Sequence, residues 1–312
     1  MELTKVERVL ILADGRKSDA CVLLKEIEQW LLPRVKQVAT EDDLICYCSD
    51  TRVSEFKPGE LPDLVVVIGG DGSILSAVRT FATDVVPVLG VNVGRVGFLA
   101  TVDLPNWSSV LEEVLAGDGV LEPRMRLEAE LVRSGEDSIS SVALNDAVIE
   151  RHSGHGLPTY TLEVDGEWVT NYRADGLIIA TPSGSTGHSL AAGGPLLAPA
   201  MEGWIVTPIC AHSLAHRPMV LHPDSRISIR LLETVSPCSV AIDGQGHNQM
   251  ELGDELRLAR HPVSYPLVVR RGIDSYRRIR DRLGWSGSMI GTENRSKMDA
   301  PPPCSLSLLI RG

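Results

Sequence analysis

The stretch VVVIGGDGSIL, from Val65 to Leu75, decides the fold of the first part of the chain. Its apolar half predicts a buried strand, and the glycines predict a turn into a helix that Ser73 can cap. Backbone N–H groups at such a helix start commonly bind phosphate. The turn carries Asp71 where a phosphate loop would carry Lys, and neither GK[ST] nor GxGxxG is present here. Asp71 is therefore either an N-cap or a group that handles a proton or a metal-bound water.

The same alternation of strand and helix extends outward from this turn. Apolar runs at 9–13, 44–48, 64–68 and 85–91 predict strands, and residues 18–32 predict an amphipathic helix. Strands that are apolar throughout and separated by helices predict a parallel sheet covered on both faces. We therefore expect an α/β domain over residues 1–122.

The pattern changes near residue 122, where short alternating strands begin. Thr161 to Thr170 predicts two strands around Asp165-Gly166, which is a strong hairpin signal. The alternation at 227–231 and 256–258 predicts a mostly antiparallel β domain over 123–264. Residues 275–285 predict a basic helix with Ile279 and Leu283 on one side. Its arginines are expected to face solvent, or else a nucleotide or another subunit: Arg277, Arg278, Arg280 and Arg282. The tail 286–312 is expected to be disordered.

Composition limits the classes of function. The chain has 312 residues, a net charge of −11 and a pI near 5.2, which argues against nonspecific binding to nucleic acid or anionic membranes. The six cysteines form no CxxC pair, so reduced thiols are expected, and Cys46 and Cys48 are interpreted as core packing. No signal peptide and no apolar run of about 20 residues is seen. We therefore expect a cytoplasmic protein without a membrane or nucleic-acid partner.

Two further motifs carry polar groups suited to a nucleotide. The segment DGLIIATPSGSTGHSLAAGGP, residues 175–195, places hydroxyls and glycines around an expected helix start. Asn145-Asp146 can bind the neighbouring hydroxyls of a ribose, because both side chains accept hydrogen bonds and the amide also donates. Taken alone, the first could be a polar loop and the second an ordinary turn. His212 and His216 lie four residues apart without HExxH, which favours a structural pair over metal ligands.

These motifs together resemble the NAD kinase family. The ordered set is GGDGS at 69–73, NVGRVGFL at 92–99, LND at 144–146, the 175–195 segment, HSLAHRPMVL at 212–221 and DGQ at 243–245. The resemblance covers about residues 5–285. It implies phosphorylation of the adenosine 2′-hydroxyl of NAD by ATP, and usually a dimer or tetramer. It also implies an N-terminal α/β domain, a C-terminal β-sandwich, and a last segment, 265–285, that returns to the first domain.

The resemblance also implies roles for individual residues. Asp71 would be the general base, and the backbone of Gly72 would approach the ligand. Asn145 and Asp146 would hold ribose hydroxyls, Phe98 would lie against a base ring, and Gln245 would close the site. The remaining dinucleotide contacts would be Arg173, Asp175, Thr186, Gly187, His188, Ser189, Leu190 and Ala191.

The chemistry explains why an acid stands beside phosphates. The transition state of phosphoryl transfer asks for positioning and charge neutralisation more than for a strong nucleophile. Asp71 can orient the hydroxyl and take its proton as the O–P bond forms, which typically accelerates a reaction by roughly 10²–10⁴. A divalent cation, expected to be Mg²⁺ held mainly by ATP phosphates and not by a protein metal site, would offset the repulsion.

Two departures from the family pattern are seen, and two alternatives stay open. Ser73 replaces a common Thr and keeps the hydroxyl, whereas Gly187-His188 stands where relatives commonly have Ala-Tyr. The second departure bears on the choice between NAD and NADH. A lipid kinase of the diacylglycerol or sphingosine type shares a GGDG turn but would not be expected to carry the 175–195 segment. A nucleotide-binding sensor without turnover is the other alternative, and the intact Asp71 argues against it.

Overall fold

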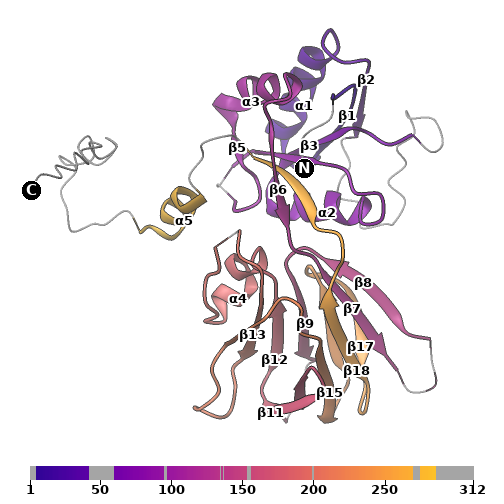
Figure 1. Ribbon diagram of the computed structural model, residues 1–312, viewed down its shortest axis with the longest axis vertical. Helices are drawn as coiled ribbons and strands as arrows, with labels where there is room; N and C mark the ends of the chain where they lie inside the picture. The colour runs from indigo at the N-terminus through magenta and orange to yellow at the C-terminus, as the bar shows by residue number, and fades with distance from the viewer. Residues whose placement is uncertain are drawn as a thin grey trace, which may run out of the picture.

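The computed structural model describes residues 5–41, 60–94, 97–133, 135, 137–152, 156–198, 200–269 and 275–285. The expected strand at 44–48, with Cys46 and Cys48, and the tail 286–312 lie outside these residues. Figure 1 shows two parts, one built from a sheet with helices and the other from two sheets, joined by strands that run between them.

The first part is a mostly parallel sheet, as expected. Its apolar strands are buried almost throughout, because helices cover both faces. The spatial order is β2 (Gln37–Glu41), β1 (Arg8–Ala13), β3 (Leu64–Gly69), β4 (Val88–Asn92), β19 (Tyr265–Val269) and β6 (Val120–Arg124), with β5 (Val102–Asp103) on β4. Among the described strands of this sheet, only β19 and β6 pair in antiparallel fashion.

Amphipathic helices cover this sheet (Figure 1). Helices α1 (Ser18–Leu31) and α3 (Trp107–Leu115) pack on one face, and α2 (Asp71–Thr80) packs on the other. The expected cap by Ser73 is wrong: α2 already begins at Asp71, and no side chain caps it. Gly70, in extended conformation, takes the N-cap position, and its carbonyl accepts the Ser73 N–H at 3.1 Å. Asp71 is the first helical residue, so it is not the N-cap either.

The second part is a β-sandwich of two antiparallel sheets. Alternate residues of both sheets point inward and form one apolar core around Trp204, Tyr160 and Tyr172. One sheet has the order β11 (Glu167–Arg173), β10 (Thr159–Val164), β15 (Ile227–Glu233), β18 (Glu255–Arg260), β7 (Leu127–Val132), β8 (Ile139–Ala143). The other has β14 (Met219–Leu221), β13 (Trp204–Ile209), β12 (Gly176–Ala180), β9 (Asp146–Arg151), β16 (Cys238–Ile242), β17 (Gln245–Met250).

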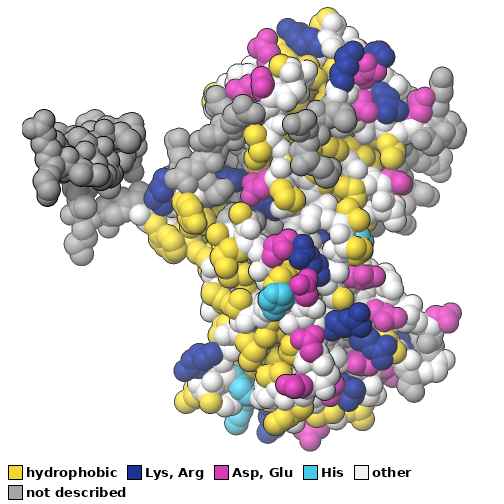
Figure 2. Space-filling model, in the orientation of Figure 1, with side chains coloured by type: hydrophobic (Ala, Val, Ile, Leu, Met, Phe, Trp, Pro, Cys, Tyr) yellow, Lys and Arg dark blue, Asp and Glu magenta, His cyan; other side chains and the backbone are white. Residues whose placement is uncertain are grey.

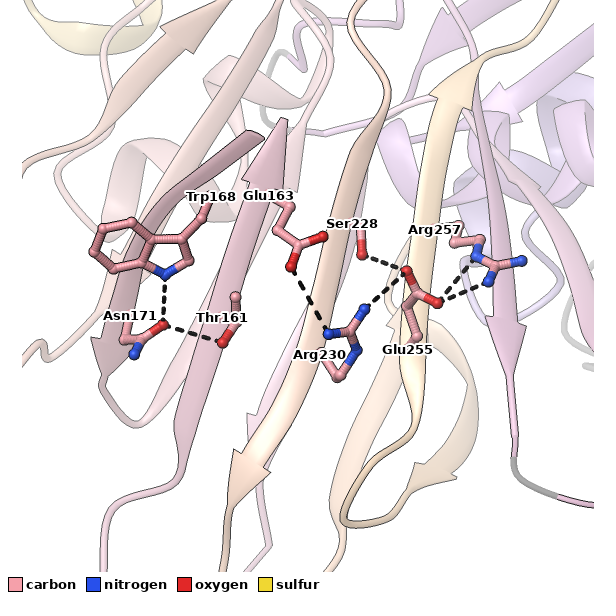
Figure 3. Close-up of polar contacts among 8 residues, drawn as sticks. All are labelled: Thr161, Glu163, Trp168, Asn171, Ser228, Arg230, Glu255 and Arg257. Carbon is pink, nitrogen blue, oxygen red and sulfur yellow. Dashed lines mark hydrogen bonds and ion pairs between the residues drawn. The ribbon is translucent and has the colours of Figure 1, made fainter. Parts of the chain in front are cut away.

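The expected hairpin between β10 and β11 is confirmed. Asp165 and Gly166 have φ angles of 54° and 83°, as the tight turns that suit the twist of a hairpin require. Polar side chains cover the outer face of the same sheet, where Figure 3 shows them pairing from strand to strand. Arg230 lies 3.7 Å from Glu163 and 3.8 Å from Glu255, and Glu255 also accepts from Ser228 and Arg257.

The surface shows no segregation by charge on the face drawn in Figure 2. Over the sandwich, Lys and Arg side chains lie interspersed with Asp and Glu side chains. Within the described ranges, no helix is both long enough and apolar enough to cross a bilayer. Helix α5 (Ser275–Leu283) ends the described part and lies beside the region where the two parts meet (Figure 1).

Candidate active site

The order of the parallel strands locates the first half of the site. The chain moves from β1 outward to β2 and then returns to the other side of β1 for β3, so the strand order reverses between β1 and β3. Ligands of open α/β sheets bind at such a point, beyond the carboxyl ends of the strands. Asp14 follows β1 there, and the turn Gly69 to Asp71 follows β3. Arg16 donates to both oxygens of Asp14, at 2.9 and 3.1 Å, and this contact lowers the pKa of the Asp14 carboxyl.

The carboxylate of Asp71 is anchored by residues 98–100, in the segment between β4 and β5. Its Oδ1 accepts the N–H groups of Leu99 at 3.0 Å and Ala100 at 3.3 Å, and its Oδ2 accepts the N–H of Phe98 at 2.9 Å. A carboxylate offers about four acceptor positions, two on each oxygen. Among the described residues only Phe98 donates to Oδ2, which leaves this oxygen one position for a further donor, such as a substrate hydroxyl.

A close approach at Gly97 makes this arrangement possible. A Cβ atom at residue 97 would lie 1.9 Å from Asp71 Oδ1, which is far inside van der Waals contact. Gly72, in contrast, is exposed, and a Cβ there would meet no protein atom within 4 Å. The backbone of Gly72 is thus open on the side where a ligand can approach.

The second half of the site is the turn 144–146 at the start of β9. Asp243 accepts three backbone N–H groups from this turn: Leu144 at 2.8 Å, Asn145 at 2.7 Å and Asp146 at 3.1 Å. On the other side, the N–H of Thr181 donates to the Asn145 carbonyl at 2.8 Å. The main chain of Asn145 and Asp146 is therefore held from two neighbouring strand ends, β16 and β12.

Two carboxyl groups, Asp146 and Asp243, lie together at this turn. Burial, and to a smaller extent the charge of Asp243, raise the pKa of Asp146 to about 7. Burial also raises the pKa of the Asp243 carboxyl, but the three N–H groups that it accepts favour its charged form, so we assign the proton to Asp146 and the charge to Asp243. Asp146 can then donate a hydrogen bond near neutral pH as well as accept one.

A cavity of about 280 Å³ joins the two parts of the molecule. Its lining includes Leu75 of α2 from the first part and, from the sandwich, Asn145, Asp146, His188, Asp243 and His247. Asn145 Oδ1 is buried and has no hydrogen-bond partner in the described residues. An unsatisfied buried acceptor of this kind costs about 1–3 kcal/mol, so a ligand that donates to it binds more favourably.

Several hydroxyl groups of the 175–195 segment form hydrogen bonds within the protein, so this segment shapes the site more than it offers free hydroxyls to a ligand. Thr186 donates to the Ser183 carbonyl at 2.9 Å, Ser185 donates to the Pro182 carbonyl at 2.6 Å, and the buried Ser189 pairs with Thr207 at 2.9 Å. His188 begins the short helix α4 (His188–Ala191), and its Nε2 lies 4.0 Å from Glu150 Oε1. Of the predicted run 186–191, His188 lines the cavity, Gly187, His188 and Ala191 are exposed, Thr186 and Leu190 are half-buried, and Ser189 is buried.

Four of the predicted residues, Arg173, Asp175, Gln245 and Phe98, lie outside the lining of this cavity. Arg173 and Asp175 precede β12, at the opposite end of that strand from Thr181, and Asp175 pairs with Arg151 at 2.6 Å. Five strand residues span roughly 17 Å. Gln245 begins β17 next to the cavity-lining Gly244, but does not line the cavity itself. Phe98 lies at a separate small pocket with Thr186 and Arg278.

His216, one of the two histidines at 212 and 216, packs against an aromatic ring. The ring of His216 lies 4.6 Å from that of Tyr172, and the described residues contain no group of three His, Cys, Asp or Glu side chains that could hold a metal.

The expectation that Arg278 faces solvent is wrong, because its side chain is only 11% exposed and donates to the Phe98 carbonyl.

Sequence reasoning missed the contribution of Asp243. The Asp-Gly pair after the apolar run 238–242 signals a hairpin turn, and Asp243 and Gly244 have φ angles of 49° and 71°. That signal predicts the turn but does not show that the Asp243 side chain reaches back to residues 144–146.

Known proteins share this architecture and much of this sequence. The ATP-NAD kinase N-terminal domain matches residues 9–119, and the ATP-NAD kinase C-terminal domain matches residues 144–269. The chain belongs to the ATP-NAD kinase family. The NAD kinase of Desulforamulus reducens is 34% identical over 275 residues, which is 88% of this chain and 96% of that protein.

Two more relatives agree with this assignment. The NAD kinase of Rhodopirellula baltica is 36% identical and covers 90% of this chain and 88% of its own length. The crystal structure of yeast NADH kinase complexed with NADH is 26% identical, with a TM-score of 0.79 over 93% of this chain and 91% of that one. As a member of this family, the chain is an enzyme that phosphorylates NAD with ATP, and the lipid-kinase alternative is not favoured.

Proposed function

We propose that this chain transfers the γ-phosphoryl group of ATP to the adenosine 2′-hydroxyl of NAD, with Asp71 as general base. The observation that carries the proposal is the anchored Asp71 carboxylate, whose Oδ2 accepts one N–H group from the described residues. A bond forms between the 2′-oxygen and phosphorus, and the bond from phosphorus to the ADP oxygen breaks. The 2′-hydroxyl proton passes to Asp71, and the products are NADP and ADP.

The dinucleotide occupies the cavity between α2 and the sandwich. A ribose hydroxyl donates to the unpartnered Asn145 Oδ1, and Asp146 binds the neighbouring hydroxyl. His188 forms part of the wall, Gly187 and Ala191 beside it are exposed, and we place Gly72 and Gln245 at the edge of the site and Phe98 in the separate pocket with Thr186. Arg173 and Asp175, at the far end of β12, contact the half of the dinucleotide away from the reacting ribose.

The triphosphate of ATP lies at the amino end of α2, where the backbone N–H groups of the glycine turn face it. Mg²⁺ fits this arrangement. The described residues offer no set of three ligands for an all-protein cage, and magnesium commonly binds through substrate phosphates with one or two carboxylates. When bound, Mg²⁺ neutralises charge on the phosphates, and this allows Asp71 to stand beside them.

We propose two domains for this chain: an α/β domain, 1–122 with 265–285, and a sandwich domain, 123–264. We also propose a cytoplasmic homodimer or homotetramer, with nucleotides rather than nucleic acid or membranes as its partners. Sedimentation equilibrium of the purified chain checks the oligomeric state, and a monomer at micromolar concentration would contradict it.

The direct test uses NAD, ATP and Mg²⁺ with the purified protein. We expect a product that an NADP-specific dehydrogenase reduces, and a ³¹P spectrum with a new monoester signal at the adenosine 2′ position. Tight NAD binding by calorimetry without any product would instead support the silent sensor. A product phosphorylated at another hydroxyl would contradict the proposed orientation of the ribose.

A further inference from the structure

One peptide group connects helix α5 to the carboxylate of Asp71. The carbonyl of Phe98 accepts a hydrogen bond from Arg278 Nη1 at 3.2 Å. The N–H of the same peptide group, which belongs to Leu99, donates to Asp71 Oδ1 at 3.0 Å. The guanidinium, the peptide and the carboxylate therefore form a continuous chain. Hydrogen bonds in such a chain polarise and strengthen one another in a low-dielectric surrounding.

Arg278 is itself held firmly. Its Nη2 lies 4.0 Å from Glu122 Oε2, and Glu122 Oε1 lies 3.2 Å from Nη2 of the buried Arg124. Burial lowers the pKa of Arg278, whereas the charges of Glu122 and Asp71 act in the opposite direction. Arginine keeps its charge at neutral pH even under such conditions. A buried guanidinium therefore stands one peptide group away from the proposed base.

Helix α5 also holds the other side of Phe98. The guanidinium carbon of Arg282 lies 5.7 Å from the centre of the Phe98 ring, and Ile279 is buried at the same pocket. Phe98 is thus fixed at its carbonyl and at its ring by residues one helical turn apart. The loop that carries the N–H groups for Asp71 is thus held by α5, although Arg278 follows Phe98 by 180 positions in the sequence.

We propose that Arg278 is a positioning residue for phosphoryl transfer. Acting through the Phe98–Leu99 peptide, it fixes Asp71 Oδ1 so that Oδ2 points to the substrate hydroxyl. This inference rests on the proposed role of Asp71 as general base. It assigns to the carboxyl-terminal helix a part in the reaction at the amino-terminal glycine turn.

The first test separates this role from simple packing of α5. In Arg278→Met we expect kcat to fall roughly 10- to 100-fold, because small displacements of a catalytic group have effects of that size. The KM for NAD should stay within about twofold. The matched control is Arg280→Met, an exposed position on the same helix, which should leave kcat unchanged. If KM and kcat change together, or if both variants behave alike, the proposal is wrong.

The conservative variant Arg278→Lys covers the case in which Arg278→Met does not fold. A single ammonium group can donate to the Phe98 carbonyl but cannot hold Glu122 with the same fork geometry. We expect kcat between those of the wild type and Arg278→Met, at several-fold below the wild type, with KM unchanged. A wild-type kcat in Arg278→Lys together with a wild-type kcat in Arg278→Met would contradict the proposal. If Arg278→Met does not fold, a wild-type kcat in Arg278→Lys alone would contradict it.

A double-mutant cycle tests whether Arg278 acts through Asp71. In the background of Asp71→Asn, adding Arg278→Met should reduce the residual rate less than about twofold, with product counted after long incubation. A further loss equal to that seen in the wild type would show that Arg278 acts elsewhere. A wild-type rate in Asp71→Asn alone would instead overturn the proposed base, which is a distinct result.

Discussion

At the scale of single residues, the site depends on two glycines, Gly97 and Gly72, which have no side chain. Gly97 has no room for a Cβ because Asp71 Oδ1 would lie 1.9 Å away, whereas Gly72 faces open space. The first glycine makes room for the base, and the second makes room for a ligand. The two positions therefore predict different kinetic effects for the same substitution.

Gly97→Ala is expected to reduce kcat at least 100-fold and to destabilise the fold by about 1–3 kcal/mol, because the methyl group displaces the Asp71 carboxylate. Gly72→Ala should leave the thermal midpoint unchanged and raise the KM for a substrate. Steady-state kinetics and thermal unfolding of both variants check this. Equal effects of the two substitutions on kcat would contradict the account.

His188 is the residue that departs most from the family pattern in the cavity wall. Its side chain is 43% exposed there, and its Nε2 lies 4.0 Å from Glu150 Oε1. A tyrosine offers a larger flat ring to a base or ribose. His188→Tyr is therefore expected to lower the KM for NAD, measured with NAD and NADH in parallel. An unchanged or raised KM for NAD would show that the ring does not face the dinucleotide.

At the scale of elements, the turn 144–146 is held between the ends of β12 and β16. Asp243 provides the anchor, and its charge lies next to the buried Asp146. The pKa of Asp146 is about 7 in the folded protein and 3.8 in its ordinary state. The folded protein thus binds this proton more tightly than the unfolded chain does. The stabilising contribution is complete below about pH 3.8 and is lost as the pH rises through about 7.

Asp146→Asn cannot ionise, so it should be more stable than the wild type by a much larger margin at pH 8 than at pH 5. Each pH unit between the two pKa values changes the difference by about 1.4 kcal/mol at most. Urea unfolding of both proteins at the two pH values measures it. A stability difference that does not depend on pH would show that Asp146 ionises in the ordinary range. The KM of Asp146→Asn for NAD is expected to be raised at both pH values.

The polar ladder on the outer face of the β11–β8 sheet is a contrasting element. Arg230 is 41% exposed and pairs with Glu163 and Glu255 at 3.7 and 3.8 Å (Figure 3). Exposed pairs of this kind contribute about 0–1 kcal/mol. Arg230→Ala should therefore change the free energy of unfolding by less than about 1 kcal/mol and leave kcat unchanged. A large loss of activity would place a functional surface on this sheet.

At the scale of the whole molecule, local patterns predicted the elements well. The apolar runs at 64–68 and 9–13 and the helix at 18–32 match β3, β1 and α1 to within a residue, because burial on both faces leaves a continuous apolar signal. The hairpin at Asp165-Gly166 was equally clear. The start of α2 was not clear from the sequence, because Gly70 occupies the N-cap position and no side chain caps the helix.

The contacts between distant segments could not be predicted from local patterns. Asp71 meets residues 98–100, Asp243 meets residues 144–146, and Arg278 meets Phe98 across 180 positions. No spacing rule connects such residues, because the sheets bring them together only after folding. Arg278 was expected in solvent for this reason: the helical periodicity shows a basic face but not what that face covers.

The measurement that tests the central claim most directly is NADP formation by Asp71→Asn beside the wild type, with NAD binding measured calorimetrically on both. The amide keeps the size of the carboxylate but is a far poorer proton acceptor. We predict that kcat falls roughly 10²–10⁴-fold while the Kd for NAD changes less than about fivefold. Equal kcat values in the two proteins would contradict the account and leave the reaction without Asp71 as its base.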